Sequence, residues 1–91
     1  AKEVGHRGIR VNAVCPVLVS TEGLLTALNS EHSPAKGKPE TFLGDFKKNN
    51  SALNRLPKGD DIGNMCVFLG SKRSSAITGQ CINIDCGVLP Q

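Results

Sequence analysis

Aromatic residues are scarce in this 91-residue chain, which has three Phe and neither Trp nor Tyr. Its core must therefore be small and built mainly from Val, Ile, Leu and Ala, a composition that suits packed strands and helices. The scarcity of rings also leaves few residues on which nucleic-acid bases could stack, and the 11 Lys and Arg residues form no basic run. Because the formal net charge is only +3, we expect no nucleic-acid partner.

Long apolar runs are absent as well. No segment approaches the roughly 20 apolar residues that a membrane-spanning helix needs, and none has the pattern of a signal peptide. The cysteines at positions 15, 66, 81 and 86 form no C-x-x-C pair, and neither histidine lies at a zinc-like spacing from them. Four cysteines could form disulfides, but disulfide scaffolds are usually denser in cysteine. We expect four reduced thiols, no metal site, no membrane contact and a cytoplasmic location.

The beginning of the chain indicates a segment of a longer protein. Residues 1–4 resemble the last turns of a helix but have no capping residue before them. Residues 5–8, Gly-His-Arg-Gly, form a helix-breaking cluster. A chain of this length makes one small domain at most. We therefore expect residues 1–91 to be part of a single domain.

Two segments have the pattern of short strands. Residues 9–15 alternate, and Val14 adds apolar character to the second face, which is typical of a parallel strand covered on both sides. Pro16 should end this strand, because proline has no N–H to donate. Residues 81–85 form the second strand, and the Asp85 carboxylate is expected to accept N–H groups of the following turn. Asn12, a polar residue inside the first strand, is expected to bond to backbone rather than to substrate.

Helices are predicted between these strands. A short one over residues 22–28 would carry three leucines on one stripe, and Pro39 could open a second one after an exposed loop. The clearest helix has Asp60 as its N-cap and Gly70 as its stop. Its apolar stripe is Ile62, Met65, Cys66 and Leu69. Two strands joined by a long helical crossover predict an α/β fold with parallel strands, and further strands must lie beside them.

Three motifs in register resemble the short-chain dehydrogenase/reductase family. Residues 8–16 read G-I-R-V-N-A-V-C-P, similar to the family's sixth strand. Arg55, Pro57, Asp61, Ile62, Phe68 and Leu69 resemble its last helix. Residues 77–85 read I-T-G-Q-C-I-N-I-D, similar to its last strand. The resemblance implies that residues 1–91 are the C-terminal part of a doubly wound Rossmann-type sheet, with its last two strands and the helices between them.

The resemblance also implies a site for NAD or NADP, where the cofactor exchanges hydride with a carbonyl or alcohol substrate. Its nicotinamide would be held by the backbone after the first strand and by a hydroxyl, from the residues Pro16, Val17, Leu18, Val19 and Thr21. Thr21 could instead be a plain helix N-cap, and the two roles are compatible. Residues 22–52 would form the substrate-loop region, with an apolar wall of Leu24, Leu25 and Leu28. These leucines could equally pack a helix onto the sheet.

The catalytic residues of the family are missing from this chain. Its chemistry needs a Tyr with a nearby Lys that lowers the Tyr pKa, and a Gly-rich loop for the pyrophosphate. The chain has no Tyr and no such loop, so we assign it no catalytic residue and expect it to be inactive alone. Val17 and Cys86 stand where the family usually has Gly, which would strain the backbone if either position has positive φ.

Two hypotheses for function follow. In the first, the chain is the C-terminal part of an NAD(P)-dependent oxidoreductase. In the second, it is a non-catalytic remnant that acts through subunit association. The resemblance implies a homo-oligomer formed through the helix at 60–70 and the strand at 81–85, and Phe68, off the main stripe, is consistent with such an interface. The substrate and the choice between NAD and NADP depend on residues outside these motifs.

Overall fold

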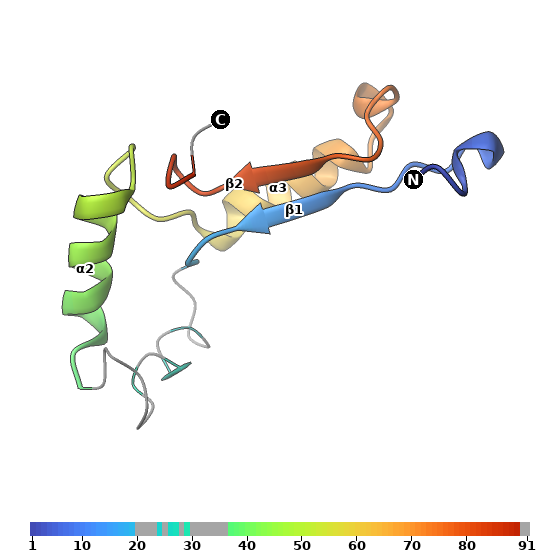
Figure 1. Ribbon diagram of the computed structural model, residues 1–91. Coiled ribbons are helices and arrows are strands. Elements are labelled where there is room, and N and C mark those ends of the chain that lie inside the picture. Colours follow the sequence, from blue (N-terminus) through green and yellow to red (C-terminus); the bar gives the residue numbers. More distant parts are fainter. Residues whose placement is uncertain (20–23, 25, 28, 30–36, 90–91) are drawn as a thin grey trace.

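The protein is an open α/β arrangement in which one helix covers a two-stranded sheet (Figure 1). The computed structural model describes residues 1–19, 24, 26–27, 29 and 37–89. Its elements, in chain order, are the 3-10 turn η1 (Gly5–Arg7), β1 (Ala13–Pro16), α2 (Pro39–Asn50), α3 (Gly59–Leu69), the 3-10 turn η2 (Lys72–Ser74) and β2 (Cys81–Ile84). The radius of gyration, 16.3 Å, exceeds the roughly 12 Å of a compact chain this long. The predicted α/β class is confirmed.

The two strands pair in parallel, as predicted. Ala13 lies opposite Cys81, and Pro16 opposite Ile84. β1 begins at Ala13 rather than at residue 9, because residues 9–12 bond irregularly to the loop before β2: the backbone N–H of Gly79 donates to the carbonyl of Val11 at 2.8 Å. Pro16 is the last residue of the strand and not the first beyond it.

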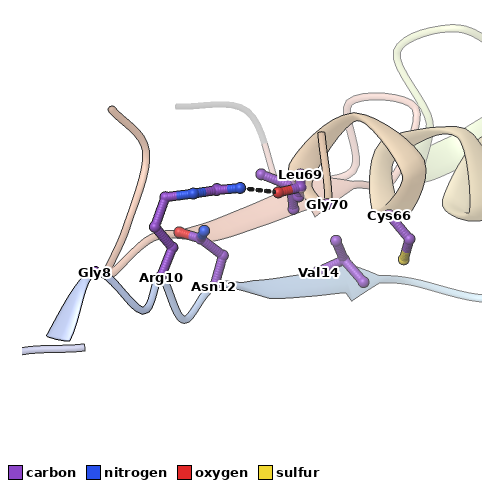
Figure 2. A pocket seen from close by; sticks show the side chains of 7 residues that line it. All are labelled: Gly8, Arg10, Asn12, Val14, Cys66, Leu69 and Gly70. Carbon is purple, nitrogen blue, oxygen red and sulfur yellow. Dashed lines mark hydrogen bonds between the residues drawn. The ribbon is translucent and has the colours of Figure 1, made fainter. Parts of the chain in front are cut away.

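Only one face of the sheet is covered by the described part of the chain. Arg10, Asn12 and Val14 lie on the side of α3 (Figure 2). Ile9 and Val11, which alternate with them, are 44% and 48% exposed. The strand was expected to be covered on both faces, and the described part of the chain covers one of them. A pair of strands with an open face is rarely stable alone, which agrees with a sheet that extends beyond these 91 residues.

Two polar side chains at the start of β1 tie the sheet to the segment after α3. The guanidinium of Arg10 donates to the carbonyls of Leu69 at 2.7 Å and of Ile77 at 3.2 Å, and to the Ser74 hydroxyl at 3.0 Å. The amide of Asn12 donates to Ile77 O at 3.0 Å, and its oxygen accepts from the backbone N–H of Gln80 at 3.1 Å. The predicted backbone role of Asn12 is confirmed.

Three members of the predicted stripe of helix α3, Ile62, Met65 and Leu69, are partly covered, whereas the fourth, Cys66, is exposed. The start of the helix differs from the prediction. The N-cap is Lys58 and not Asp60, which lies inside the helix. Asp61 takes over the capping role, because its Oδ2 accepts the backbone N–H of Lys58 at 2.8 Å. On the outer surface of the helix, Val67 is 75% and Phe68 38% exposed. The predicted role of Phe68 in a subunit interface stays a prediction.

Helix α2 begins at Pro39, as predicted, and stands apart from the sheet (Figure 1). Phe42 and Phe46 stack along it with ring centroids 6.4 Å apart. At the chain start, residues 1–4 form a turn that leads into η1, and the expected tail of an α-helix is not present there. None of the described helices has the length and apolarity required to cross a bilayer.

Candidate functional site

The carboxyl ends of β1 and β2 meet at one edge of the sheet, because the strands run parallel. Residues 17–19 leave this edge from β1, and residues 85–89 leave it from β2 (Figure 1). In open α/β sheets, ligands bind beyond the carboxyl ends of the strands, where loops present backbone groups. The edge thus collects the predicted cofactor-binding residues Pro16, Val17, Leu18 and Val19 in one place.

The segment after β1 is half-buried, and two of its peptide groups have no hydrogen-bond partner among the described residues. Val17, Leu18 and Val19 are each partly covered. Within the described ranges, the peptide groups of Leu18 and Val19 have no hydrogen-bond partner. Each of these peptide groups therefore has a donor and an acceptor to offer, which suits a ligand that both donates and accepts. Nicotinamide carries a carboxamide of that kind, and the segment fits it.

Val17 does not have the strained backbone that a valine in place of glycine could impose. The non-glycine residues with positive φ, among those described, are Asn54 and Cys86. Val17 therefore adopts an ordinary conformation, and the concern about backbone strain at this position is removed.

The remaining predicted residues are only partly placed. Leu24 is half-buried and helical. Its described neighbours Thr26 and Ala27 are also helical. Thr21, Leu25 and Leu28 lie outside the described residues, so their roles toward cofactor and substrate stay predictions.

The turn after β2 is held by the buried carboxylate of Asp85. Its Oδ1 accepts the backbone N–H of Gly87 at 2.9 Å, and its Oδ2 that of Leu89 at 3.0 Å. This confirms the predicted role of Asp85. Cys86, which lies between Asp85 and Gly87, has φ +54°. This left-handed conformation costs a residue with a side chain about 1–2 kcal/mol. The glycine-like geometry is therefore kept at Cys86 despite the side chain.

A serine that the sequence patterns did not single out joins this turn to the end of α2. Ser51 is 8% exposed, and its hydroxyl lies 2.6 Å from Arg55 O and 3.1 Å from Cys86 O. The backbone N–H of Leu53 also donates to Cys86 O, at 3.0 Å. The only local signal in the sequence would have been a serine at the end of a helix. Its partner Cys86 lies 35 residues away, and no sequence pattern connects the two.

An ion pair borders the same edge. Arg55 Nη1 lies 3.2 Å from Asp61 Oδ2. The Lys58 N–H and then the Arg55 guanidinium hold the pKa of Asp61 below its ordinary value. Both residues line a shallow cavity of about 340 Å³ together with Asn83 and the Asp85–Gly87 turn.

A larger cavity lies away from this edge. It measures about 440 Å³ and is lined by Arg10, Asn12 and Val14 of the β1 side and by Cys66, Leu69 and Gly70 of the α3 side (Figure 2). Arg10 and Asn12 spend their donors on backbone carbonyls there. None of the predicted site residues lines it, so we assign the functional site to the carboxyl edge.

Comparison with known proteins decides the family. Residues 1–89 match a family model described as enoyl-(acyl carrier protein) reductase, one of the models of the short-chain dehydrogenases/reductases. The chain belongs to the short-chain dehydrogenase/reductase family. The predicted resemblance is confirmed over nearly its whole length.

Named relatives in this family are oxidoreductases. The chain is 33% identical over 88 residues to the (S)-acetoin-forming diacetyl reductase of Staphylococcus aureus, covering 97% of this chain and 34% of the relative. It is 36% identical over 92 residues to L-2,3-butanediol dehydrogenase of Corynebacterium glutamicum, covering 98% of this chain and 34% of that protein. The chain thus spans about a third of the length of the curated relatives it matches.

Solved structures of the family have the same fold. A short-chain dehydrogenase family protein from Francisella tularensis superposes with a TM-score of 0.85 at 28% identity, over 100% of this chain and 37% of that one. L-sorbose reductase from Gluconobacter frateurii, complexed with NADPH and L-sorbose, gives 0.80 at 25% identity, over 99% of this chain and 34% of that one. The described elements therefore correspond to one part of a larger short-chain dehydrogenase/reductase fold.

Proposed function

We propose that residues 1–91 are the C-terminal segment of an NAD(P)-dependent oxidoreductase that moves hydride between the nicotinamide and a carbonyl or alcohol. The observation that carries this proposal is that, among the described residues, the peptide groups of the partly covered Leu18 and Val19, beyond the carboxyl end of β1, have no hydrogen-bond partner. The family and its oxidoreductase relatives support it.

In this proposal the chain holds the nicotinamide and does not perform proton transfer. The bound cofactor supplies or takes up the hydride. The peptide groups of Leu18 and Val19, with the Thr21 hydroxyl, would hold its carboxamide, and Pro16 and Val17 would lie beside it. With no Tyr in the chain, the acid–base group comes from another part of the protein, and the 91 residues are inactive by themselves.

The substrate side is proposed to be the region of residues 22–52, with Leu24, Leu25 and Leu28 as an apolar wall. A small carbonyl or alcohol, the class named for the diacetyl and butanediol relatives, suits a wall without charged groups.

The free state of all four cysteines supports a reducing, cytoplasmic location.

The test is oxidation of NADH or NADPH by the full gene product that carries these 91 residues, with diacetyl as the first carbonyl and intact mass recorded on the same sample. Turnover of either cofactor is the expected result. A full product that contains a Tyr and a Gly-rich loop but oxidises neither cofactor with a panel of ketones would overturn the proposal.

A second candidate is a non-catalytic subunit that acts by association. The exposed apolar surface of α3, where Val67 is 75% and Phe68 38% exposed, favours a homo-oligomer through the helix at 60–70 and the strand at 81–85. Light scattering after size exclusion distinguishes the two: a stable oligomer without turnover favours this second function, whereas turnover favours the first.

A further inference from the structure

Within the described residues, the end of helix α2 is connected to the turn after β2. The helix makes no extensive contact with any other helix or strand within the described ranges (Figure 1). The loop that follows it, residues 51–57, packs against the turn after β2, and Leu56 and Pro57 are buried there. The contact between these two loops therefore ties the end of α2 to the carboxyl edge of the sheet.

Two residues form the centre of this contact. The single hydroxyl proton of Ser51 is donated to Arg55 O at 2.6 Å, with Cys86 O as a second acceptor at 3.1 Å. The same hydroxyl accepts the backbone N–H of Arg55 at 3.3 Å. The carbonyl of Cys86, a residue with a left-handed backbone, also accepts the N–H of Leu53.

The next residue brings the two loops into closest approach. A Cβ on Gly87 would lie 2.4 Å from the Cβ of Ala52, far inside van der Waals contact, and φ at Gly87 is +84°. Glycine is thus required here both for its conformation and for the approach of the other loop. Ser51 thus bonds to the carbonyl of Cys86, and the next residues of the two loops, Ala52 and Gly87, meet closely.

We propose that Ser51 and the Cys86–Gly87 turn form a joint that positions α2, and that Ser51 is a positioning residue for the substrate. The contacts alone support the role of the joint in the position of α2. Its role toward the substrate rests on the proposed function of residues 22–52. Among the described residues, no hydrogen bond links the joint to Leu18 or Val19, so we expect it to act on the substrate side and to leave the cofactor side unchanged.

The experiment compares Ser51→Ala with Ser51→Thr, which keeps the hydroxyl, in the full gene product. Gly87→Ala opens the joint from the other side; its control, Gly5→Ala, adds a Cβ that meets nothing within 4 Å. We expect Ser51→Ala and Gly87→Ala to raise KM for the carbonyl about ten-fold, with KM for the cofactor within about two-fold of the unmodified protein. Ser51→Thr restores the KM for the carbonyl, and Gly5→Ala leaves both KM values unchanged. A loss of kcat with both KM values unchanged would mean mere destabilisation and would overturn the proposal.

Hydrogen exchange of the same variants separates this proposal from the proposed function. Ser51→Ala should speed exchange of the α2 amides about ten-fold and leave those of α3 and β2 unchanged, with recovery in Ser51→Thr. If the unmodified protein turns over no substrate, the proposed function fails, and exchange alone judges the joint. Equal acceleration in all elements, or none in α2, would refute it.

Discussion

The guanidinium of Arg10 donates a 2.7 Å hydrogen bond to the backbone carbonyl of Leu69, the last residue of α3. The carbonyls at the end of a helix have no partner within it, and a positive charge there also offsets the helix dipole. Since Arg10 bonds in addition to the Ser74 hydroxyl and to Ile77 O, one side chain fixes α3 against the entry to both strands. This gives a structural reason for the arginine in the G-I-R-V-N motif.

Arg10→Ala should therefore lower the free energy of unfolding by about 2–3 kcal/mol, because several buried or half-buried acceptors lose a charged donor. Urea unfolding of the protein measures it. Arg73→Ala is the matched control, since the Arg73 side chain is exposed and no hydrogen bond from its guanidinium is present in the described structure; it should cost less than about 0.5 kcal/mol. Equal effects of the two substitutions would contradict the role of Arg10.

The lowered pKa of Asp61 predicts a pH dependence of stability. The folded state favours its carboxylate, through the Lys58 N–H first and Arg55 second. The stabilisation is therefore full above the ordinary pKa of a carboxyl group and is lost as the pH falls through the lowered pKa. Asp61→Asn should destabilise the protein at neutral pH and converge with the unmodified protein in strong acid. Because the pair is half-exposed, the difference should be modest. A gap that widens toward acid would contradict this sign.

Cys86→Gly should stabilise the protein slightly, by about 0.5–1 kcal/mol, because glycine removes the cost of the left-handed conformation and keeps the carbonyl that Ser51 and Leu53 use. Thermal unfolding measures the change. The opposite substitution at the neighbour, Gly87→Ala, should cost at least about 2 kcal/mol, because it adds both strain and overlap. A destabilised Cys86→Gly would show that the thiol itself contributes to the turn.

The thiols of Cys15 and Cys81 lie on the same face of the sheet. The Cys81 thiol beside it, with some loss of hydration, raises the pKa of Cys15. A higher pKa leaves less thiolate at neutral pH, so Cys15 should react with iodoacetamide more slowly than the exposed Cys66. Cys81→Ser should speed alkylation at Cys15, and Cys66→Ser should not. Mass spectrometry of timed samples gives the rates, and equal rates at Cys15 and Cys66 would refute this prediction.

Elements with strong local patterns were predictable from the sequence. The stripe of α3 and the proline at the start of α2 are local features, and both helices lie where these patterns place them. The alternation of 81–85 likewise predicts β2. The cap of α3 was mispredicted, because Asp61 reaches back to the Lys58 N–H and makes Asp60 unnecessary as a cap.

Features that depend on distant partners were not predictable. β1 starts four residues late because residues 9–12 bond to a loop nearly 70 positions away, in pairs such as Gly79 N–H to Val11 O. The contact between Ser51 and Cys86 spans 35 residues and has no periodic signal. The segment after Pro16 was predicted to bind the cofactor from its resemblance to the family, and the lack of partners for its peptide groups within the described residues was seen only in the structure.

The most direct test of a nicotinamide site at the end of β1 is the affinity of the full gene product for NADH and NADPH with Val19 replaced. Val19→Pro removes one peptide N–H, and Val19→Ala, the control, keeps it. Fluorescence titration should show cofactor binding weakened about ten-fold or more in Val19→Pro and changed less than about two-fold in Val19→Ala. Undiminished binding in a folded Val19→Pro protein would contradict the proposed site.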